Sequence, residues 1–201
     1  KALGQRVDAL TWMSEETKKR AQEKLSSFIV KIGYPDKWMD YSSLDIDESK
    51  TYYQNLEAAV RFMQADNLKD LGKPVDRTKW LMSPQEVNAY YMPTTNEICF
   101  PAGILQPPFF NMEADDAVNY GAIGVVIGHE MTHGFDDEGS NFDKDGNMNN
   151  WWTAEDRQKF EVTTQRLAKQ FSSVTVAPGI KANGELTLGE NIADQGGLTI
   201  A

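Results

Sequence analysis

The hydrophobic pattern of the first third of the chain has helical periodicity. Ser14 suits the N-cap of a helix over residues 14–31, and Gly33 with the residues after it ends that pattern. The apolar positions of this segment are Leu25, Phe28, Ile29 and Ile32. A second, partly periodic pattern predicts a helix from about residue 48 to residue 71. We therefore expect residues 1–75 to form a helical lead-in to the rest of the chain.

The pattern then changes from helical to extended. Residues 86–91 and 97–100 are predicted to be strands, and the turn residues at 93–96 join them. The following segment, 101–110, is strongly apolar, yet its glycine and prolines oppose regular structure. We expect it to be a loop that lies over a core.

A helix is predicted from about residue 114 to residue 134. It contains Gly121, Gly124 and Gly128, and each glycine costs up to ~1 kcal/mol relative to alanine inside a helix. Three such residues in one helix predict that another backbone approaches it closely.

Two more helices are predicted in the last third of the chain. Thr153 caps a helix that runs to about Ser172, and a final helix starts at Thr187, which has capping-box spacing to Glu190. The inward-facing positions of the first of these helices are Phe160, Leu167 and Phe171.

The helix over residues 114–134 carries the motif H-E-x-x-H at His129, Glu130 and His133. Positions i and i+4 of a helix share one face, so two imidazoles can hold one zinc ion with Glu130 beside it as a general base. The chain has only two histidines, and a spacing of four arises by chance in roughly 1 in 100 such pairs, so the match is informative. The alternative is a buried helix with two hydrogen-bonded histidines and no metal.

Glu190 and Asp194 form a second acidic motif. They stand four residues apart, so both carboxylates share one helix face. One interpretation is a solvated acidic face with an N-cap, and the other is a metal ligand with a partner behind it. A catalytic zinc takes three protein ligands and keeps a fourth position for water. With no third histidine and no cysteine nearby, a carboxylate has to be the third ligand, which favours the metal interpretation.

Charge and composition narrow the possible partners. The 201 residues have a formal net charge of −10, which disfavours nucleic acid or an anionic membrane as a partner. The apolar runs are far shorter than the ~20 residues that a membrane span needs. The single cysteine, Cys99, excludes an intrachain disulfide, and its apolar neighbours indicate a buried side chain.

Four motifs of the sequence belong together. Residues 88–91 read N-A-Y-Y, 100–110 read F-P-A-G-I-L-Q-P-P-F-F, 128–137 read G-H-E-M-T-H-G-F-D-D and 189–198 read G-E-N-I-A-D-Q-G-G-L. In this combination the chain resembles the neprilysin family of zinc endopeptidases, which includes endothelin-converting enzyme and bacterial oligopeptidases. The resemblance covers nearly the whole chain.

The resemblance implies a thermolysin-like zincin fold, an α+β and mainly α-helical catalytic domain with a small β-sheet. Residues 1–201 are then part of this single domain. Residues 1–75 would be its helical lead-in, and residues 76–201 would contain the edge-strand hairpin, the zinc helix and the helix of the third ligand.

The resemblance also implies a role for each site residue. His129, His133 and Glu190 would bind one Zn²⁺ ion, Glu130 would be the catalytic base, and Asp194 would orient His129 through its far ring nitrogen. Asn88 and Ala89, on an edge strand, would bind the backbone of an oligopeptide substrate by strand addition.

The sequence departs from the family pattern in two ways. The family has a further catalytic histidine and an arginine beyond the Gly-Gly-Leu segment, and the chain stops at Ala201 without them. The large helical part upstream, which walls off the active-site cavity in the family, is mostly absent. We therefore expect an incomplete catalytic portion. One cysteine fits a bacterial member better than the disulfide-rich animal ectoenzymes, and we expect it in the periplasm or outside the cell in preference to the cytoplasm.

The predicted function is that of a zinc-dependent endopeptidase, which hydrolyses oligopeptides on the amino side of hydrophobic residues. A zinc-activated water would be the nucleophile and Glu130 the general base. The first alternative is a chain that binds zinc but is catalytically silent, because the downstream histidine and arginine are missing. The second is a structural helical domain without metal, which zinc binding would exclude.

Overall fold

The structure is a computed structural model that describes residues 1–201, and the chain divides into two compact units. Unit 1 consists of Lys1–Tyr34 and Met82–Ala201, and unit 2 consists of Pro35–Leu81. The first 34 residues of the chain therefore pack with its carboxyl-terminal part in unit 1.

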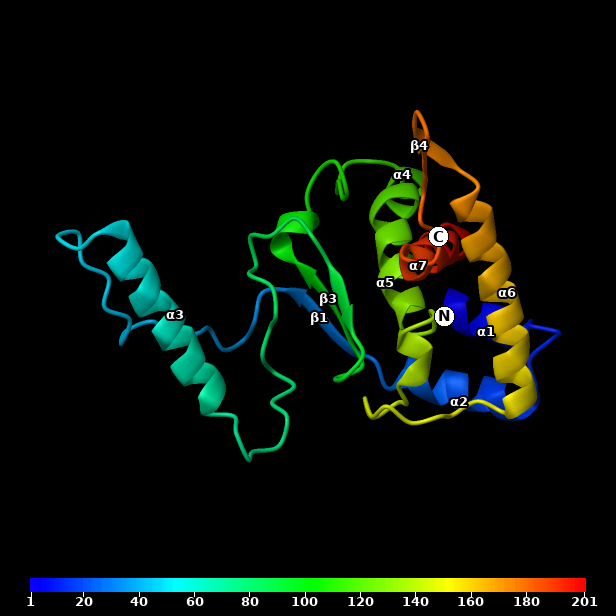
Figure 1. The fold of residues 1–201 in the computed structure, drawn as a ribbon, viewed down its shortest axis with the longest axis horizontal. Coiled ribbons are helices and arrows are strands. Elements are labelled where there is room, and N and C mark those ends of the chain that lie inside the picture. Colours follow the sequence, from blue (N-terminus) through cyan, green and yellow to red (C-terminus); the bar gives the residue numbers. More distant parts are fainter. The chain divides into compact units, whose positions relative to one another are not determined.

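The elements of unit 1 confirm an α+β chain that is mainly helical (Figure 1). The helices of this unit are α1 (Ala2–Asp8), α2 (Glu15–Ser26), α4 (Asp116–Asn119), α5 (Val125–His133), α6 (Ala154–Ser172) and α7 (Leu188–Ile200). The strands are β1 (Ile29–Gly33), β2 (Tyr90–Met92), β3 (Glu97–Pro101), β4 (Thr175–Ala177) and β5 (Ile180–Lys181). A π-helical turn at Tyr120–Gly124 joins α4 to α5, so the predicted helix over residues 114–134 is confirmed.

Unit 2 contains one helix, α3 (Tyr52–Leu68), between two loop segments. Thr51 and Gln54 form a capping box at its start, and the rings of Tyr41 and Phe62 lie 5.7 Å apart. The helix expected over residues 48–71 is therefore present but shorter at both ends. No helix of either unit is long and apolar enough to cross a membrane.

The three-stranded sheet has the order β1-β3-β2. The central strand β3 runs parallel to β1, with Ile29 opposite Glu97, and antiparallel to β2, with Tyr90 opposite Cys99. Strand β2 therefore lies at the edge of the sheet. It overlaps the end of the strand predicted over residues 86–91, which was expected to be an edge strand. Cys99 is fully buried, as expected, and burial raises the pKa of its thiol to about 11.

The helix predicted over residues 14–31 is shorter in the structure than predicted. It stops at Ser26, and Ile29–Gly33 instead form β1. The apolar run from Phe28 to Ile32 fits a helical stripe, but its β-branched residues also favour a strand. The parallel pairing with β3, which lies far along the sequence, decides for the strand.

The strand predicted over residues 86–91 begins later in the structure than predicted. Ser83 and Glu86 close a turn, with the Glu86 amide donating to the Ser83 carbonyl over 3.0 Å. The Gly103 amide also donates to the Pro84 carbonyl over 2.8 Å. These bonds hold the chain in a turn over Gly103, so regular strand pairing starts only at Tyr90.

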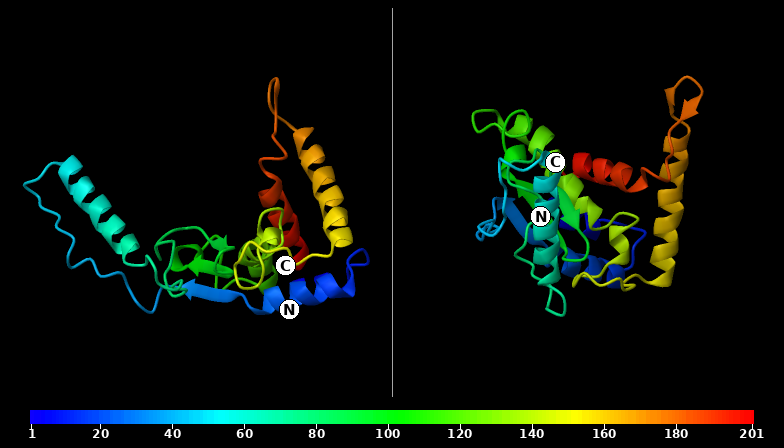
Figure 2. Two further views of the ribbon diagram at one scale, coloured as in Figure 1. Left: turned by 60° about the horizontal axis from the view of Figure 1, so that its bottom comes forward. Right: turned by 60° about the vertical axis from the view of Figure 1, so that its left-hand side comes forward.

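The elements of unit 1 are arranged around α5 (Figures 1 and 2). The three-stranded sheet lies on one side of α5, α7 packs against its other side, and α6 lies beyond α7. One apolar cluster fills the space between the sheet and α5. Its buried members are Ala89, Ile98, Phe100, Ile104 and Ile123. A second cluster lies among α1, α2 and the start of α6. Its buried members are Val7, Met13, Ala21, Trp151 and Trp152.

A buried carboxylate, Asp156, joins the amino-terminal ends of α2 and α6. Ser14 caps α2 and Thr153 caps α6, as predicted. The Asp156 carboxylate accepts hydrogen bonds from the Ser14 amide over 3.1 Å and from the Thr17 hydroxyl over 2.6 Å. Burial alone would raise the pKa of Asp156, but the hydrogen bonds from Ser14, Thr17 and Thr153 hold it far below its usual range.

We expect Asp156→Asn to lower the free energy of unfolding by about 2 kcal/mol at pH 7, because buried donors lose a charged acceptor. The pKa is lower in the folded state, so this stabilisation is complete above the unfolded pKa of about 4 and fades as the pH falls further. Urea unfolding at pH 7 and at pH 3 measures both effects. Glu155→Gln on the exposed side of α6 is the control, and equal stability of the two variants at pH 7 would contradict the prediction.

Candidate metal centre

The two histidines of the H-E-x-x-H motif lie side by side on α5. Their Nε2 atoms are 2.9 Å apart, and their rings meet edge to face. Both side chains are mostly buried, with fewer than one fifth of their surfaces exposed. The helical spacing therefore brings His129 and His133 together as predicted.

Glu190 approaches the histidine pair from the first turn of α7. Its Oε2 atom lies 3.3 Å from Nε2 of His129 and 3.7 Å from Nε2 of His133. The capping box expected between Thr187 and Glu190 does not form, since Thr187 makes no side-chain cap. The Glu190 side chain faces the histidines instead of turning back to the helix end.

The other ring nitrogen of each histidine has a carboxylate partner. Nδ1 of His129 lies 2.9 Å from Oδ1 of Asp194, and Nδ1 of His133 lies 2.7 Å from Oδ2 of Asp136. The first contact has the geometry expected for Asp194. Asp136 was missed in the sequence, although its position three residues after His133 is a local signal. It lies beyond the end of α5 at His133, so the contact depends on the path of the chain after the helix.

These contacts decide what Nε2 of His129, Nε2 of His133 and the Glu190 carboxylate oxygen can bind together. A carboxylate oxygen accepts a hydrogen bond, so each histidine carries its proton on Nδ1 and keeps a lone pair on Nε2. Two lone pairs and a carboxylate oxygen then face one another, all within 4.8 Å. Such a set attracts a cation.

The spacing of these atoms fits zinc. In a tetrahedral site with zinc–nitrogen bonds of about 2.0–2.1 Å, donor atoms lie about 3.3 Å apart. The three observed separations of 2.9, 3.3 and 3.7 Å bracket this value. Nitrogen and carboxylate donors are also ligands that zinc accepts. The residues present therefore fit the ion.

Burial and nearby charges shift the pKa values of Glu130 and His133. Burial raises the pKa of Glu130, and the nearby histidines oppose this shift only in part. Burial alone would lower the pKa of His133, but its hydrogen bond to Asp136 and the surrounding carboxylates raise it. Glu130 is only 6% exposed, and this burial disfavours its charged form, which makes the carboxylate a stronger proton acceptor.

A hollow of about 360 Å³ opens beside the histidines. It brings Asn88 and Ala89 together with His129, Glu130 and Glu190. Ala89 is buried, and its amide donates to the Asn88 side chain over 2.9 Å. The two residues precede β2 directly and do not belong to the strand itself, in contrast to the expectation.

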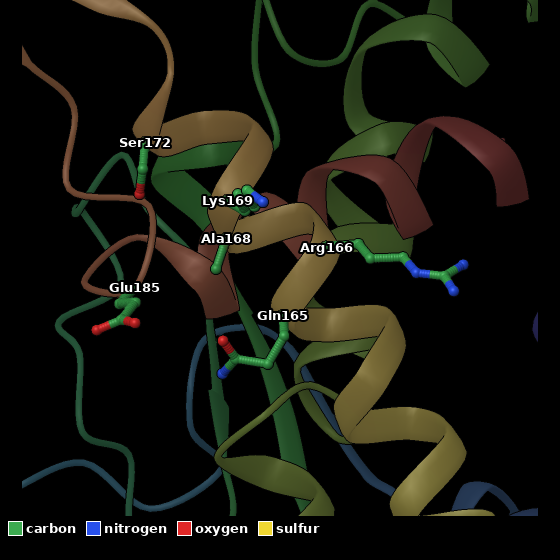
Figure 3. A pocket seen from close by; sticks show the side chains of 6 residues that line it. All are labelled: Gln165, Arg166, Ala168, Lys169, Ser172 and Glu185. Atoms are coloured by element: carbon green, nitrogen blue, oxygen red, sulfur yellow. The ribbon is translucent and has the colours of Figure 1, made fainter.

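A second hollow, of about 460 Å³, lies against α6 (Figure 3). Arg166 points away from Glu185 and Ser172 in this hollow, so its polar side chains do not converge on one point. The Ser172 hydroxyl accepts a hydrogen bond from the Gly184 amide over 3.0 Å, which ties the loop before α7 to α6. The chemistry of the chain is therefore concentrated at the histidines.

Close backbone packing sets the position of α7 against α5. A Cβ atom on Gly128 would lie 2.8 Å from Cα of Gly197, so the two helices cross with their backbones in contact. The predicted close approach is thus confirmed at Gly128. It is wrong at Gly121, where a Cβ atom would meet nothing within 4 Å, and at Gly124 the contacts are ordinary.

The sequence matches a known family over most of its length. Residues 88–201 match the profile of Peptidase family M13, and residues 1–35 match a second profile with the same description. The chain is 49% identical over 195 residues to Neprilysin-11 of Caenorhabditis elegans, covering 93% of this chain and 23% of the relative. It is 45% identical over 204 residues to human neprilysin, covering 96% of this chain and 27% of the relative.

Solved structures agree with the sequence comparison. The chain superposes with a TM-score of 0.94 on the zinc metalloprotease Zmp1 of Mycobacterium tuberculosis in complex with an inhibitor, at 48% identity over 99% of this chain and 31% of that chain. PepO of Lactobacillus rhamnosis HN001 gives 0.92 at 39% identity, over 99% of this chain and 32% of that chain. This chain therefore spans about a quarter of the curated relatives and about a third of the solved structures. Its relatives come from animals and bacteria, so a bacterial origin stays a prediction.

Proposed function

Because the chain belongs to Peptidase family M13, we propose that it forms the zinc-binding part of an endopeptidase that cleaves oligopeptides on the amino side of hydrophobic residues. The observation that carries this proposal is the convergence of His129, His133 and Glu190, whose ligand atoms lie within 4.8 Å of one another. The structural neighbours Zmp1 and PepO support the same assignment.

The proposal gives each polar group around the metal a role. Nε2 of His129, Nε2 of His133 and Oε2 of Glu190 would hold zinc, and Asp194 and Asp136 would fix the two rings through their Nδ1 protons. When bound, zinc would polarise the scissile carbonyl and lower the pKa of a water molecule toward about 7.

Glu130 would move the proton. Its carboxylate lines the hollow beside both histidines and would take a proton from the attacking water. Burial raises the pKa of Glu130, which suits a group that must first accept this proton and then deliver it to the leaving amine. The same burial keeps bulk water away from the transferred proton.

Asn88 and Ala89 would hold the substrate. They line the hollow and lead directly into the edge strand β2, where an extended peptide could add as a further strand. The Ala89 amide now donates to the Asn88 side chain, and a substrate carbonyl would replace that acceptor. The side-chain NH2 group of Asn88, which this contact does not use, would donate to another substrate carbonyl.

A second candidate function is zinc binding without turnover. It is favoured by the lining of the hollow, which includes no lysine or arginine. In the proposed ligand set both histidines of these 201 residues would bind zinc, so neither would be available to stabilise an oxyanion. A peptide-cleavage assay on the protein with zinc bound separates the two candidates.

Zinc binding is tested first. The purified protein is expected to retain about one zinc ion per chain after dialysis against metal-free buffer. Glu190→Ala is expected to weaken zinc binding more than about 100-fold, because even partners behind the ligands contribute 10–100-fold. Glu185→Ala, on the loop before α7, is the control and should bind zinc as the parent does. A folded protein that binds no zinc would overturn the proposed function.

A further inference from the structure

Lys24 is a charged side chain that is completely buried. It lies on α2, and its Nζ atom donates to the carbonyl oxygens of Gly134, Gly139 and Phe142 over 2.6, 2.7 and 2.7 Å. An ammonium group has three donors, and here each one has an acceptor. The rings of Phe135, Trp151 and Tyr91 lie 5.5–5.8 Å from the charge.

The three carbonyls belong to the segment that leaves the zinc helix. Gly134 is the C-cap of α5, and Gly139 and Phe142 lie at the start and just after the short turn that follows. Helix carbonyls at a carboxyl-terminal end have no partner within the helix and carry partial negative charge. The Lys24 ammonium therefore caps α5 and fixes the two ends of the segment 134–142 relative to each other.

The same segment presents Asp136 to the metal centre. Oδ1 of Asp136 accepts hydrogen bonds from the amides of Glu138 and Gly139, over 2.9 and 2.7 Å. Its Oδ2 atom is left to face Nδ1 of His133. The Gly139 peptide thus takes part in both sets of contacts, since its amide holds Asp136 and its carbonyl is held by Lys24.

A buried ammonium is costly unless its surroundings compensate for lost water. Burial lowers the pKa of Lys24 to about 8, although the charges of Asp136 and Asp143 oppose this shift. No carboxylate forms a salt bridge with it, and its charge is compensated by carbonyl dipoles, ring faces and the more distant acids. A methionine of similar length would fill the same space without this cost, so the ammonium fits a role in fixing the segment.

We propose that Lys24 is a positioning residue of the zinc site, which holds the segment 134–142 so that Asp136 orients His133 for metal binding. The inference rests on the proposed function. It places a determinant of metal affinity in α2, within the residues 1–35 that match a separate family profile from the histidines. Lys24 touches neither the ligand atoms nor the hollow, and its effect passes through the Gly139 peptide and Asp136.

The test measures zinc affinity of the intact protein by chelator competition, well below its unfolding temperature. Lys24→Met is expected to weaken zinc binding about 10-fold or more, the range found when a partner behind a ligand is lost. The spectrum of the Co²⁺-substituted variant is expected to change as well, since His133 turns relative to the ion. Near-UV circular dichroism verifies the fold, and Lys24→Gln, which keeps amide donors, replaces Lys24→Met if that variant does not fold.

Two comparisons separate positioning from simple stability. Asp156→Asn also removes a buried charge from a hydrogen-bond network. Its partners Ser14 and Thr17 belong neither to the proposed ligand set nor to the segment 134–142, so this variant should change zinc affinity less than about twofold. Asp136→Ala should weaken zinc binding as much as Lys24→Met does. In the double variant the two losses should not add, because both act through one contact.

Each outcome bears on a different proposal. If the parent protein binds no zinc, the zinc site itself is wrong and the inference falls with it. If the parent binds zinc and the folded Lys24 variants bind it equally well, the inference is wrong and the proposed function stands. Additive losses in the double variant would likewise contradict a path from Lys24 through Asp136.

Discussion

Glu130→Gln is expected to leave zinc bound and to lower kcat for peptide hydrolysis by a factor of about 10²–10⁴, the usual contribution of a general acid–base group. Glutamine has the size of glutamate but cannot take a proton from water at neutral pH. Glu130 lies outside the proposed ligand set of the neighbouring histidines and Glu190, so the metal site should remain intact. A quenched fluorescent peptide with an internal hydrophobic residue measures turnover, and elemental analysis measures zinc.

The exposed Glu113, before α4, provides the control for this variant. Glu113→Gln removes the same charge and should change kcat less than about twofold, as expected for a surface substitution. Normal turnover by Glu130→Gln would contradict its role as the base. A parent protein that holds zinc but cleaves no peptide would instead favour the silent zinc-binding candidate.

The parts of this fold that depend on local spacing could be predicted from the sequence. Ser14 and Thr153 cap their helices, because a hydroxyl at an N-cap reaches the amide three residues on. Likewise, His129 and His133 share a helix face on any helix that contains them. By elimination the sequence favoured a carboxylate as a third ligand, and the resemblance to the neprilysin family implied that Glu190 is this carboxylate. The approach of Glu190 to the histidines depends on the packing of α7 on α5.

The parts that depend on distant partners could not be predicted in this way. The run from Phe28 to Ile32 is compatible with a helix or a strand, and its parallel pairing with β3 decides. Lys24 resembles any other lysine of a charged amphipathic helix, and only the fold reveals that three carbonyls of residues 134–142 surround it. Asp136 did carry a local signal, its position three residues after His133. The sequence did not show that the chain after α5 turns the Asp136 carboxylate toward Nδ1 of His133.

Gly197→Val is expected to lower the free energy of unfolding by at least about 3 kcal/mol and to weaken zinc binding about 10-fold or more. A Cβ atom at Gly197 would lie 2.5 Å from the Val125 carbonyl oxygen and 2.9 Å from the His129 amide nitrogen. Both atoms belong to the backbone of α5 and cannot turn aside as a side chain can. The helix α7 would have to move away, and Glu190, two turns earlier on α7, would move with it.

Gly121→Ala is the matched control, because it adds a methyl group to the same long helix where a Cβ atom meets nothing within 4 Å. Alanine favours helix by up to ~1 kcal/mol over glycine, so this variant should be as stable as the parent or slightly more stable, with unchanged zinc affinity. Urea unfolding and chelator competition on both variants measure the two effects. A Gly197→Val protein that matched Gly121→Ala in both would show that α5 and α7 do not need contact between their backbones. The position of Glu190 would then have to be set by the loop before α7. If Gly197→Val instead loses both stability and zinc affinity, the backbone contact at Gly197 sets the distance between Glu190 and the two histidines.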